Sequence, residues 1–204
     1  MTKYTTIGFK NPVDPFIVLE NAKVRMEPLT LEHLPALNEI GLHEELWRWT
    51  NAICTTEAAL RHYIEEALRA REQGTVVPFA TFDKVSGRVV GSSRFGNIDS
   101  HNRRVEIGWT WITPSAQRTH VNSAAKLLML GYAFEELGCI RVELKTDALN
   151  TKSRNAMLRL GCREEGTFRS HMITDAGRVR DTVYFSIIEE EWPPIRERLV
   201  NSLR

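Results

Sequence analysis

The residues best suited to chemistry lie where a predicted strand meets a predicted helix. The strand ends at Thr113-Pro114, a polar loop follows over residues 117–122, and an amphipathic helix is predicted to begin at Ser123. The first N–H groups of a helix have no partner inside it, and that end carries the positive pole of the helix dipole. The junction therefore predicts a binding site for a phosphate or pyrophosphate.

The elements before this junction form a predicted β-meander. Residues 76–112 contain three apolar runs separated by turns at residues 85–88 and 100–102, which is typical of antiparallel hairpins. A further strand is predicted over residues 23–29 and a long helix over residues 55–73. In the third strand of the meander, alternation predicts one face with Val105, Ile107, Trp109 and Trp111 and an opposite face with Glu106, Gly108 and Thr110.

The elements after the junction suggest a mixed sheet. A helix over residues 123–137 leads to the strand IRVELKTD, and this strand–helix–strand step predicts a parallel pairing. A short helix over residues 150–160, a hairpin and a final helix follow. We expect an α+β fold with a mixed, mostly antiparallel sheet of about seven strands and four or five helices. Residues 1–22 are interpreted as a leader packed on a single domain, residues 23–204.

Composition excludes several classes of function. The 27 basic and 26 acidic residues nearly cancel, which argues against strong nucleic-acid binding. No apolar run reaches ~18 residues and no signal-peptide pattern is present, so no membrane association is expected. Three scattered cysteines without a CxxC pair suggest free thiols in a reducing cytoplasm. The histidines form no cluster, so no metal is expected. The final amphipathic helix permits a homodimer.

Four segments together resemble the GNAT superfamily of acetyl-CoA-dependent N-acetyltransferases, closest to the RimJ/RimL type that acetylates ribosomal-protein N-termini. The resemblance covers roughly residues 23–192. Its most specific part is the segment with Asn150, Ser153, Asn155, Leu160-Gly161 and Glu165-Gly166. The other parts are VEIGWTWI with Pro114, the loop QRTHVNSAAK, and the closing hairpin GRVRDTVYFSIIEEEW.

The resemblance implies that acetyl-CoA donates an acetyl group to an amine, which is a protein N-terminus or a small molecule. It places the coenzyme on backbone amides from Arg118 to Ser123, with the Arg118 side chain neutralising a phosphate. Asn150 would bond the pantetheine arm, and it is also a plausible helix N-cap. The full predicted coenzyme-binding set is Ile112, Thr113, Gln117, Arg118, Thr119, His120, Val121, Asn122, Ser123, Asn150, Ser153 and Asn155.

Acetyl transfer to an amine needs a base for the ammonium proton and an acid for the leaving thiolate. Glu106 is the candidate base, and a paired or solvated glutamate is the alternative interpretation. Ser153 is the candidate acid, and helix capping alone is its alternative. Arg94 and His171 are candidates beside the acceptor, with surface roles as the alternative.

The loop departs from the family pattern because it contains no glycine. His120 and Asn122 stand where glycine or alanine is usual, and both residue types tolerate positive φ better than most. Asn122 is also expected to cap the following helix. A second hypothesis therefore stays open, in which the chain is a non-catalytic acyl-CoA-binding or regulatory module.

Overall fold

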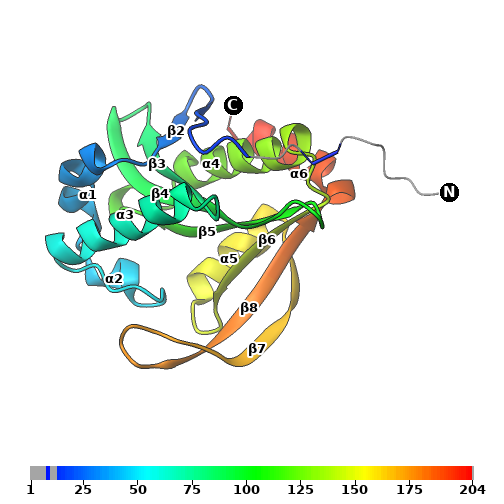
Figure 1. Ribbon diagram of the computed structural model, residues 1–204. Coiled ribbons are helices and arrows are strands. Elements are labelled where there is room, and N and C mark those ends of the chain that lie inside the picture. Colours follow the sequence, from blue (N-terminus) through cyan, green and yellow to red (C-terminus); the bar gives the residue numbers. More distant parts are fainter. Residues whose placement is uncertain (1–7, 10–12, 204) are drawn as a thin grey trace.

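The computed structural model describes residues 8–9 and 13–203, and over these residues the strands form one mixed sheet (Figure 1). Its order is β1-β2-β3-β4-β5-β6-β8-β7, and all neighbours are antiparallel except β5 and β6. The strands are β1 (Leu19–Glu20), β2 (Val24–Pro28), β3 (Val77–Asp83), β4 (Arg88–Asp99), β5 (Arg104–Ile112), β6 (Arg141–Asp147), β7 (Arg163–Ile173) and β8 (Val179–Ile188).

Helices cover both faces of this sheet (Figure 1). They are α1 (Leu34–Gly41), α2 (Glu44–Trp47), α3 (Glu57–Glu72), α4 (His120–Gly131), α5 (Thr151–Leu160) and α6 (Trp192–Ser202). A π-helical segment, Tyr132–Glu136, continues α4. In the described part of the chain, no helix combines the length and apolar character needed to cross a bilayer.

Apolar side chains gather into clusters on the two faces. The larger cluster joins β1–β6 and β8 to α4 and α6, with Phe79, Phe95 and Phe185 fully buried. A second cluster packs α1 and α3 against the sheet through Leu37, Leu60 and Trp111. Burial of this apolar surface is the main force that holds the helices on the sheet.

The predicted meander and the parallel step are both confirmed. Strands β3, β4 and β5 are antiparallel neighbours, and β5 pairs with β6 in parallel across α4. The sheet has one strand more than the roughly seven expected, because the two-residue β1 pairs with β2. Part of the expected leader, residues 1–7 and 10–12, lies outside the described residues.

The predicted alternation along β5 is wrong beyond Ile107. Trp109 has φ +51°, and the β4–β5 register shifts between Ser92 and Arg94, which marks a β-bulge. Val105 and Ile107 therefore join the α4–α6 cluster, whereas Trp111 joins the α1–α3 cluster. Trp109 is 39% exposed, and its ring lies over Gly96, where a Cβ would stand 2.4 Å from it.

Candidate functional site

Strands β5 and β6 pair over three residues and then separate. Arg104–Glu106 pairs with Arg141–Glu143, and no further pair joins the two strands. From there β5 continues to Ile112 and β6 continues to Asp147, each bonded only to its outer neighbour. We call these facing, unpaired stretches the splay. Their free backbone groups can bind an extended ligand as an additional strand would.

The last pair before the splay contains Glu106, which is buried. Its Oε2 accepts from Asn97 Nδ2 at 2.6 Å and lies 2.9 Å from Lys145 Nζ. Its Oε1 faces Gly108, where a Cβ would stand 2.7 Å from that oxygen. Glycine at this position thus leaves room beside the carboxylate. Asn97 and Lys145 fix the side chain from the neighbouring strands β4 and β6.

Sequence reasoning missed both partners of Glu106. Asn97 has φ +46° at a register irregularity of β4, a position that no alternation pattern predicts. Lys145 carried a usable signal, since it lies two residues after Glu143, the register partner of Glu106. Residues two apart on a strand share a face, so the parallel register would have placed Lys145 beside Glu106.

The junction loop leads into α4 three residues earlier than predicted. The helix begins at His120, and its N-cap is Thr119, whose hydroxyl accepts from Val121 N and donates to the Ala116 carbonyl at 2.7 Å. The expected start at Ser123 and the expected cap at Asn122 are therefore wrong. The hydrogen bond to the Ala116 carbonyl fixes the Thr119 hydroxyl, whose oxygen is then well placed to accept from the first turn of the helix.

The positive φ of the loop also lies elsewhere than expected. Arg118 has φ +62°, whereas His120 and Asn122 are helical. His120 Nε2 lies 2.8 Å from Asp83 Oδ1 at the end of β3, so the imidazole turns toward that strand. Burial works to raise the pKa of Asp83, but hydrogen bonds from Ser86 and His120 hold it below its usual value. Glycine is thus unnecessary at these two helical positions.

Gln117 connects the end of β5 to α5. Its Nε2 donates to the Ile112 carbonyl at 2.8 Å, and its Oε1 accepts from the Lys152 ammonium. Both backbone groups of Thr113 are engaged: its N–H donates to Val90 and its carbonyl accepts from Ala116. Alternate residues of β5 bond to β4, so the backbone groups of Ile112 point away from β4. The Ile112 carbonyl is already bonded to Gln117, and a ligand at the expected Ile112–Thr113 position can therefore pair only with the Ile112 N–H.

Helix α5 begins beside the splay. Asn150 is its N-cap, and its Oδ1 accepts from Ser153 N at 3.0 Å, which confirms the predicted capping role. The Ser153 side chain is half-buried, and Asn155 is exposed. The structure thus brings Asn150 and Ser153 to the N-terminus of α5, and the Lys152–Gln117 contact ties this end to the junction loop.

The two predicted acceptor residues have different surroundings. Arg94 is 5% exposed, and its guanidinium lies 4.3 Å from the centre of the Tyr63 ring and 5.7 Å from that of Trp109. Its Nε has no hydrogen-bond partner among the described residues. His171 is exposed on β7, where it stacks on Phe168 with ring centres 5.3 Å apart. Arg94 is therefore buried, and His171 is accessible.

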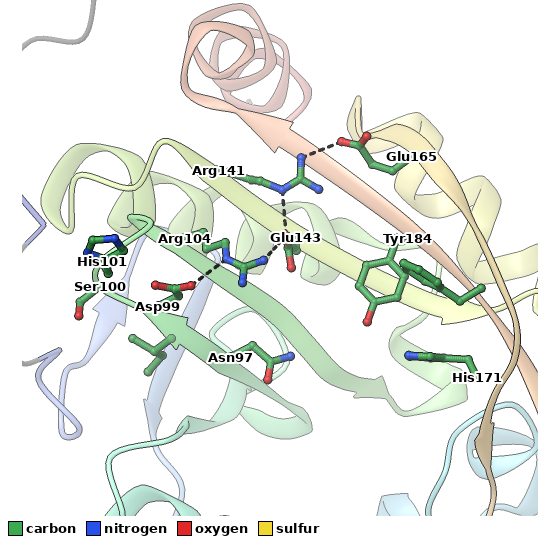
Figure 2. Close-up of a pocket in the computed structure, with 12 residues that line it drawn as sticks. Asn97, Asp99, Ser100, His101, Arg104, Arg141, Glu143, Glu165, His171 and Tyr184 are labelled. Carbon is green, nitrogen blue, oxygen red and sulfur yellow. Dashed lines mark hydrogen bonds and ion pairs between the residues drawn. The ribbon is translucent and has the colours of Figure 1, made fainter.

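A pocket of about 760 Å³ lies beside the paired ends of β5 and β6 (Figure 2). Arg104 bridges Asp99 and Glu143 at 3.1 Å each, and Arg141 bridges Glu143 and Glu165 at 2.9 and 2.7 Å. Two guanidinium groups thus meet three carboxylates. The remaining lining residues are Asn97, Ile98, Ser100, His101, Phe168, His171 and Tyr184. Asn97 connects the pocket to Glu106.

A bound metal ion or a reactive cysteine would support other kinds of chemistry. No group of three His, Cys, Asp or Glu side chains suited to a metal ion is found among the described residues. Cys54, Cys139 and Cys162 are all buried free thiols. Burial raises the pKa of each thiol to about 12, which makes them poor nucleophiles.

Comparison with known proteins identifies the family of this chain and similar folds. Residues 23–163 match the family model described as an acetyltransferase (GNAT) domain. YdaF of Bacillus subtilis (strain 168), which its name provisionally describes as a ribosomal N-acetyltransferase, is 36% identical over 106 residues, or 52% of this chain. The match spans 57% of the length of YdaF.

Two solved structures extend the similarity over nearly the whole chain. A GCN5-related N-acetyltransferase from Brucella melitensis has 31% identity and a TM-score of 0.87, covering 97% of this chain and 89% of its own. RimJ of Mycobacterium smegmatis, in complex with CoA-disulfide, has 25% identity and a TM-score of 0.74, covering 88% of each chain.

Proposed function

This chain belongs to the acetyltransferase (GNAT) domain family, and on that premise we propose that it transfers the acetyl group of acetyl-CoA to a primary amine by direct attack. The observation that carries the proposal is the splay, with the N-terminus of α4 near one end and Glu106 at the other. This arrangement can bind an extended coenzyme and hold a base at its inner end.

The coenzyme fits the residues present. The first N–H groups of α4 point out of the helix with its positive dipole end, and the exposed Arg118 adds a full positive charge for the pyrophosphate. The Ile112 N–H serves the pantetheine arm along β5. Asn150 and Ser153 are proposed to contact the same arm from α5, and Asn150 keeps its capping hydrogen bond. Acetyl-CoA supplies the activated acetyl group.

Glu106 takes the proton of the incoming amine in this mechanism. A neutral amine nitrogen then attacks the thioester carbon, the C–N bond forms, and the C–S bond breaks with its electron pair left on sulfur. The nitrogen loses its second proton as the amide forms, and Ser153 is the proposed relay, which receives a proton from that nitrogen as it passes its own to the sulfur. Lys145 and Asn97 hold Oε2 of Glu106, so Oε1, facing Gly108, is the oxygen that receives the amine proton.

The pocket beside Glu106 is the proposed entry for the acceptor. Its three carboxylates outnumber its two guanidinium groups, which suits an amine that arrives as an ammonium ion. The name of YdaF refers to a ribosomal N-acetyltransferase and so favours a ribosomal acceptor, for which we propose a protein N-terminus. A small-molecule amine fits the same pocket, so both acceptor classes belong in the test.

The test combines acetyl-CoA with a panel of amines and measures release of the free thiol. The panel contains peptides with different N-terminal residues, amino acids and polyamines. We expect thiol release that depends on the acceptor and saturates with it. Coenzyme binding in calorimetry without thiol release from any panel member would support the alternative, a non-catalytic acyl-CoA-binding module. Absence of coenzyme binding would refute both functions.

A further inference from the structure

Lys126 is a buried cation that the mechanism above does not use. It lies on α4 and is 5% exposed. Its Nζ donates one hydrogen bond, to Thr110 Oγ1 on β5 at 2.9 Å. No carboxylate of the described residues lies within 4.0 Å of this nitrogen. By contrast, Lys145 forms an ion pair with Glu106, and Lys84 forms one with Glu20. An ammonium has three donors, so two of them have no assigned partner.

The hydroxyl that holds Lys126 belongs to the splay. Thr110 lies on β5 between Ile112, where the pantetheine arm is proposed to pair, and Glu106, where the amine is proposed to lose its proton. Thr110 Oγ1 also lies 2.6 Å from Ser93 Oγ, which contacts the Gly108 carbonyl at 3.4 Å. The ammonium is therefore joined to the bulge that borders the proposed reaction centre, from the side of α4.

The surroundings of Lys126 provide no counter-charge. Burial lowers the pKa of this lysine to about 8, and the Cys162 thiol raises it in part. Cys162 is the titratable group near Lys126 from the α5–β7 junction, but burial raises its own pKa to about 12, so it stays neutral. The Glu191 carboxylate also raises the pKa of Cys162, and it forms an ion pair with Arg163 at 2.7 Å. On α4, His120 is turned to Asp83.

A buried charge without a partner costs free energy, so buried charges in proteins are normally paired, and Lys126 departs from this rule. In the proposed reaction, negative charge develops on the coenzyme sulfur as the C–S bond breaks. A positive charge fixed beforehand near that atom stabilises the transition state, because it needs no reorganisation during the step.

We propose that Lys126 is a positioning residue whose ammonium balances the negative charge on the coenzyme sulfur, acting across Thr110 from the α4 side of β5. This inference rests on the proposed function. The amine proton goes to Glu106, the C–S electron pair goes to sulfur, and Lys126 keeps its proton throughout. Its field stabilises the departing thiolate, and the second proton lost by the amine nitrogen then reaches this sulfur through Ser153.

The experiment measures the thiol pKa of bound coenzyme A. Free CoA is titrated with excess protein by the ultraviolet absorbance of the thiolate, with the same protein saturated with acetyl-CoA as the blank. We compare the unmodified chain with Lys126→Met, and we use Lys84→Met as the control that removes an exposed lysine. Below pH 8, where Lys126 is charged, we expect the thiolate fraction of bound CoA to be about tenfold larger in the unmodified chain and in Lys84→Met than in Lys126→Met, which corresponds to a thiol pKa lower by about one unit.

Steady-state kinetics provide a second measurement. We expect Lys126→Met to lower kcat about tenfold while KM for acetyl-CoA changes less than about threefold, because the lysine acts on charge that develops during the step. If Lys126→Met does not fold, Lys126→Gln removes the charge and keeps a polar end. Equal thiol pKa values in the folded variant and the unmodified chain overturn the inference.

The two proposals fail in different ways. If the unmodified chain binds CoA but transfers no acetyl group to any acceptor, the proposed function is refuted, and the thiol pKa comparison still decides the role of Lys126. If the unmodified chain binds no CoA, the proposed function and this inference are both overturned.

Discussion

Glu106 has two oxygens in different surroundings, and this difference suggests its role. Oε2 is held by Asn97 and Lys145, whereas Oε1 faces the space left by the absent side chain of Gly108. The two partners explain how a carboxylate can be 2% exposed, since buried charges need paired and hydrogen-bonded surroundings. They also orient the other oxygen toward the splay.

Glu106→Gln tests this role with little change in shape. We expect kcat/KM to fall by about 100-fold or more, a typical contribution of general base catalysis. The loss is largest at low pH, where the acceptor amine is protonated and needs a base, and it shrinks as pH rises. The measurement is the pH–rate profile. A variant whose profile runs parallel to that of the unmodified chain contradicts the assignment.

The buried charge of Lys126 also affects the stability of the folded chain. The pKa of Lys126 is about 8 in the folded chain, against an ordinary lysine value of 10.5, so between these values the unfolded chain binds more protons. Stability attributable to this group therefore rises with pH from about 8 to about 10.5 and is lowest below pH 8. We expect Lys126→Met to raise the free energy of unfolding by about 1–3 kcal/mol at pH 7.

The gain from Lys126→Met should disappear above about pH 10.5, where the lysine is neutral in both states. Urea unfolding of both chains at several pH values measures it, with Lys84→Met as the control. A difference between the two chains that does not change with pH would show that packing, rather than charge, accounts for the effect.

At the scale of elements, the junction loop shows how local signals compete. Thr119, Asn122 and Ser123 all belong to residue types that cap helices, so the sequence offers three starting points for α4. The structure selects Thr119 because its hydroxyl is fixed by the Ala116 carbonyl in the preceding turn. Positive φ then lies at Arg118, outside the helix.

Arg118→Gly separates the backbone of the loop from its charge. Glycine adopts φ +62° without the cost that a side chain brings, so we expect stability to be unchanged or to rise by up to about 1 kcal/mol. Loss of the guanidinium is expected to weaken CoA binding about fivefold to tenfold, and the difference should shrink at high salt.

The measurements for Arg118→Gly are calorimetric binding of CoA at two salt concentrations and thermal unfolding. Arg88→Gly, at an exposed position of β4, is the control for loss of a surface arginine. CoA affinity equal to that of the unmodified chain would assign the pyrophosphate to the backbone amides alone.

At the scale of the whole molecule, Asp147 joins segments that are distant in sequence. It is fully buried at the end of β6 and pairs with Arg178 and Arg180 of the β7–β8 hairpin region. Arg180 Nη1 donates to Asn51 Oδ1 at 2.8 Å, and Asp175 N donates to the Asn51 carbonyl. The long hairpin visible in Figure 1 is thereby tied to the segment between α2 and α3.

Asp147→Ala is expected to destabilise the chain by about 3 kcal/mol, because it leaves the buried Arg180 without its counter-charge. We also expect faster proteolytic cleavage in the hairpin. Arg178→Met is the matched comparison, because Arg180 still faces Asp147 in that variant. The loss of stability in Arg178→Met should therefore be smaller than in Asp147→Ala. Chemical denaturation and limited proteolysis measure both effects. Equal losses in the two variants would show that Arg180 does not depend on Asp147.

The sequence by itself determined the elements and the family resemblance. Apolar periodicity and turn residues are local properties, so the meander, the parallel step and the cap at Asn150 were predictable. The match of residues 23–163 confirms the family to which the quoted motifs pointed.

Only the tertiary structure decided which side chains meet. The bulge at Trp109 depends on the register of β4 against β5, and it reverses the predicted faces of the residues that follow. The partners of Glu106 come from two other strands, and the isolation of Lys126 depends on what packs around α4. Pairing and burial are properties of segments that are distant in sequence, and no local pattern encodes them.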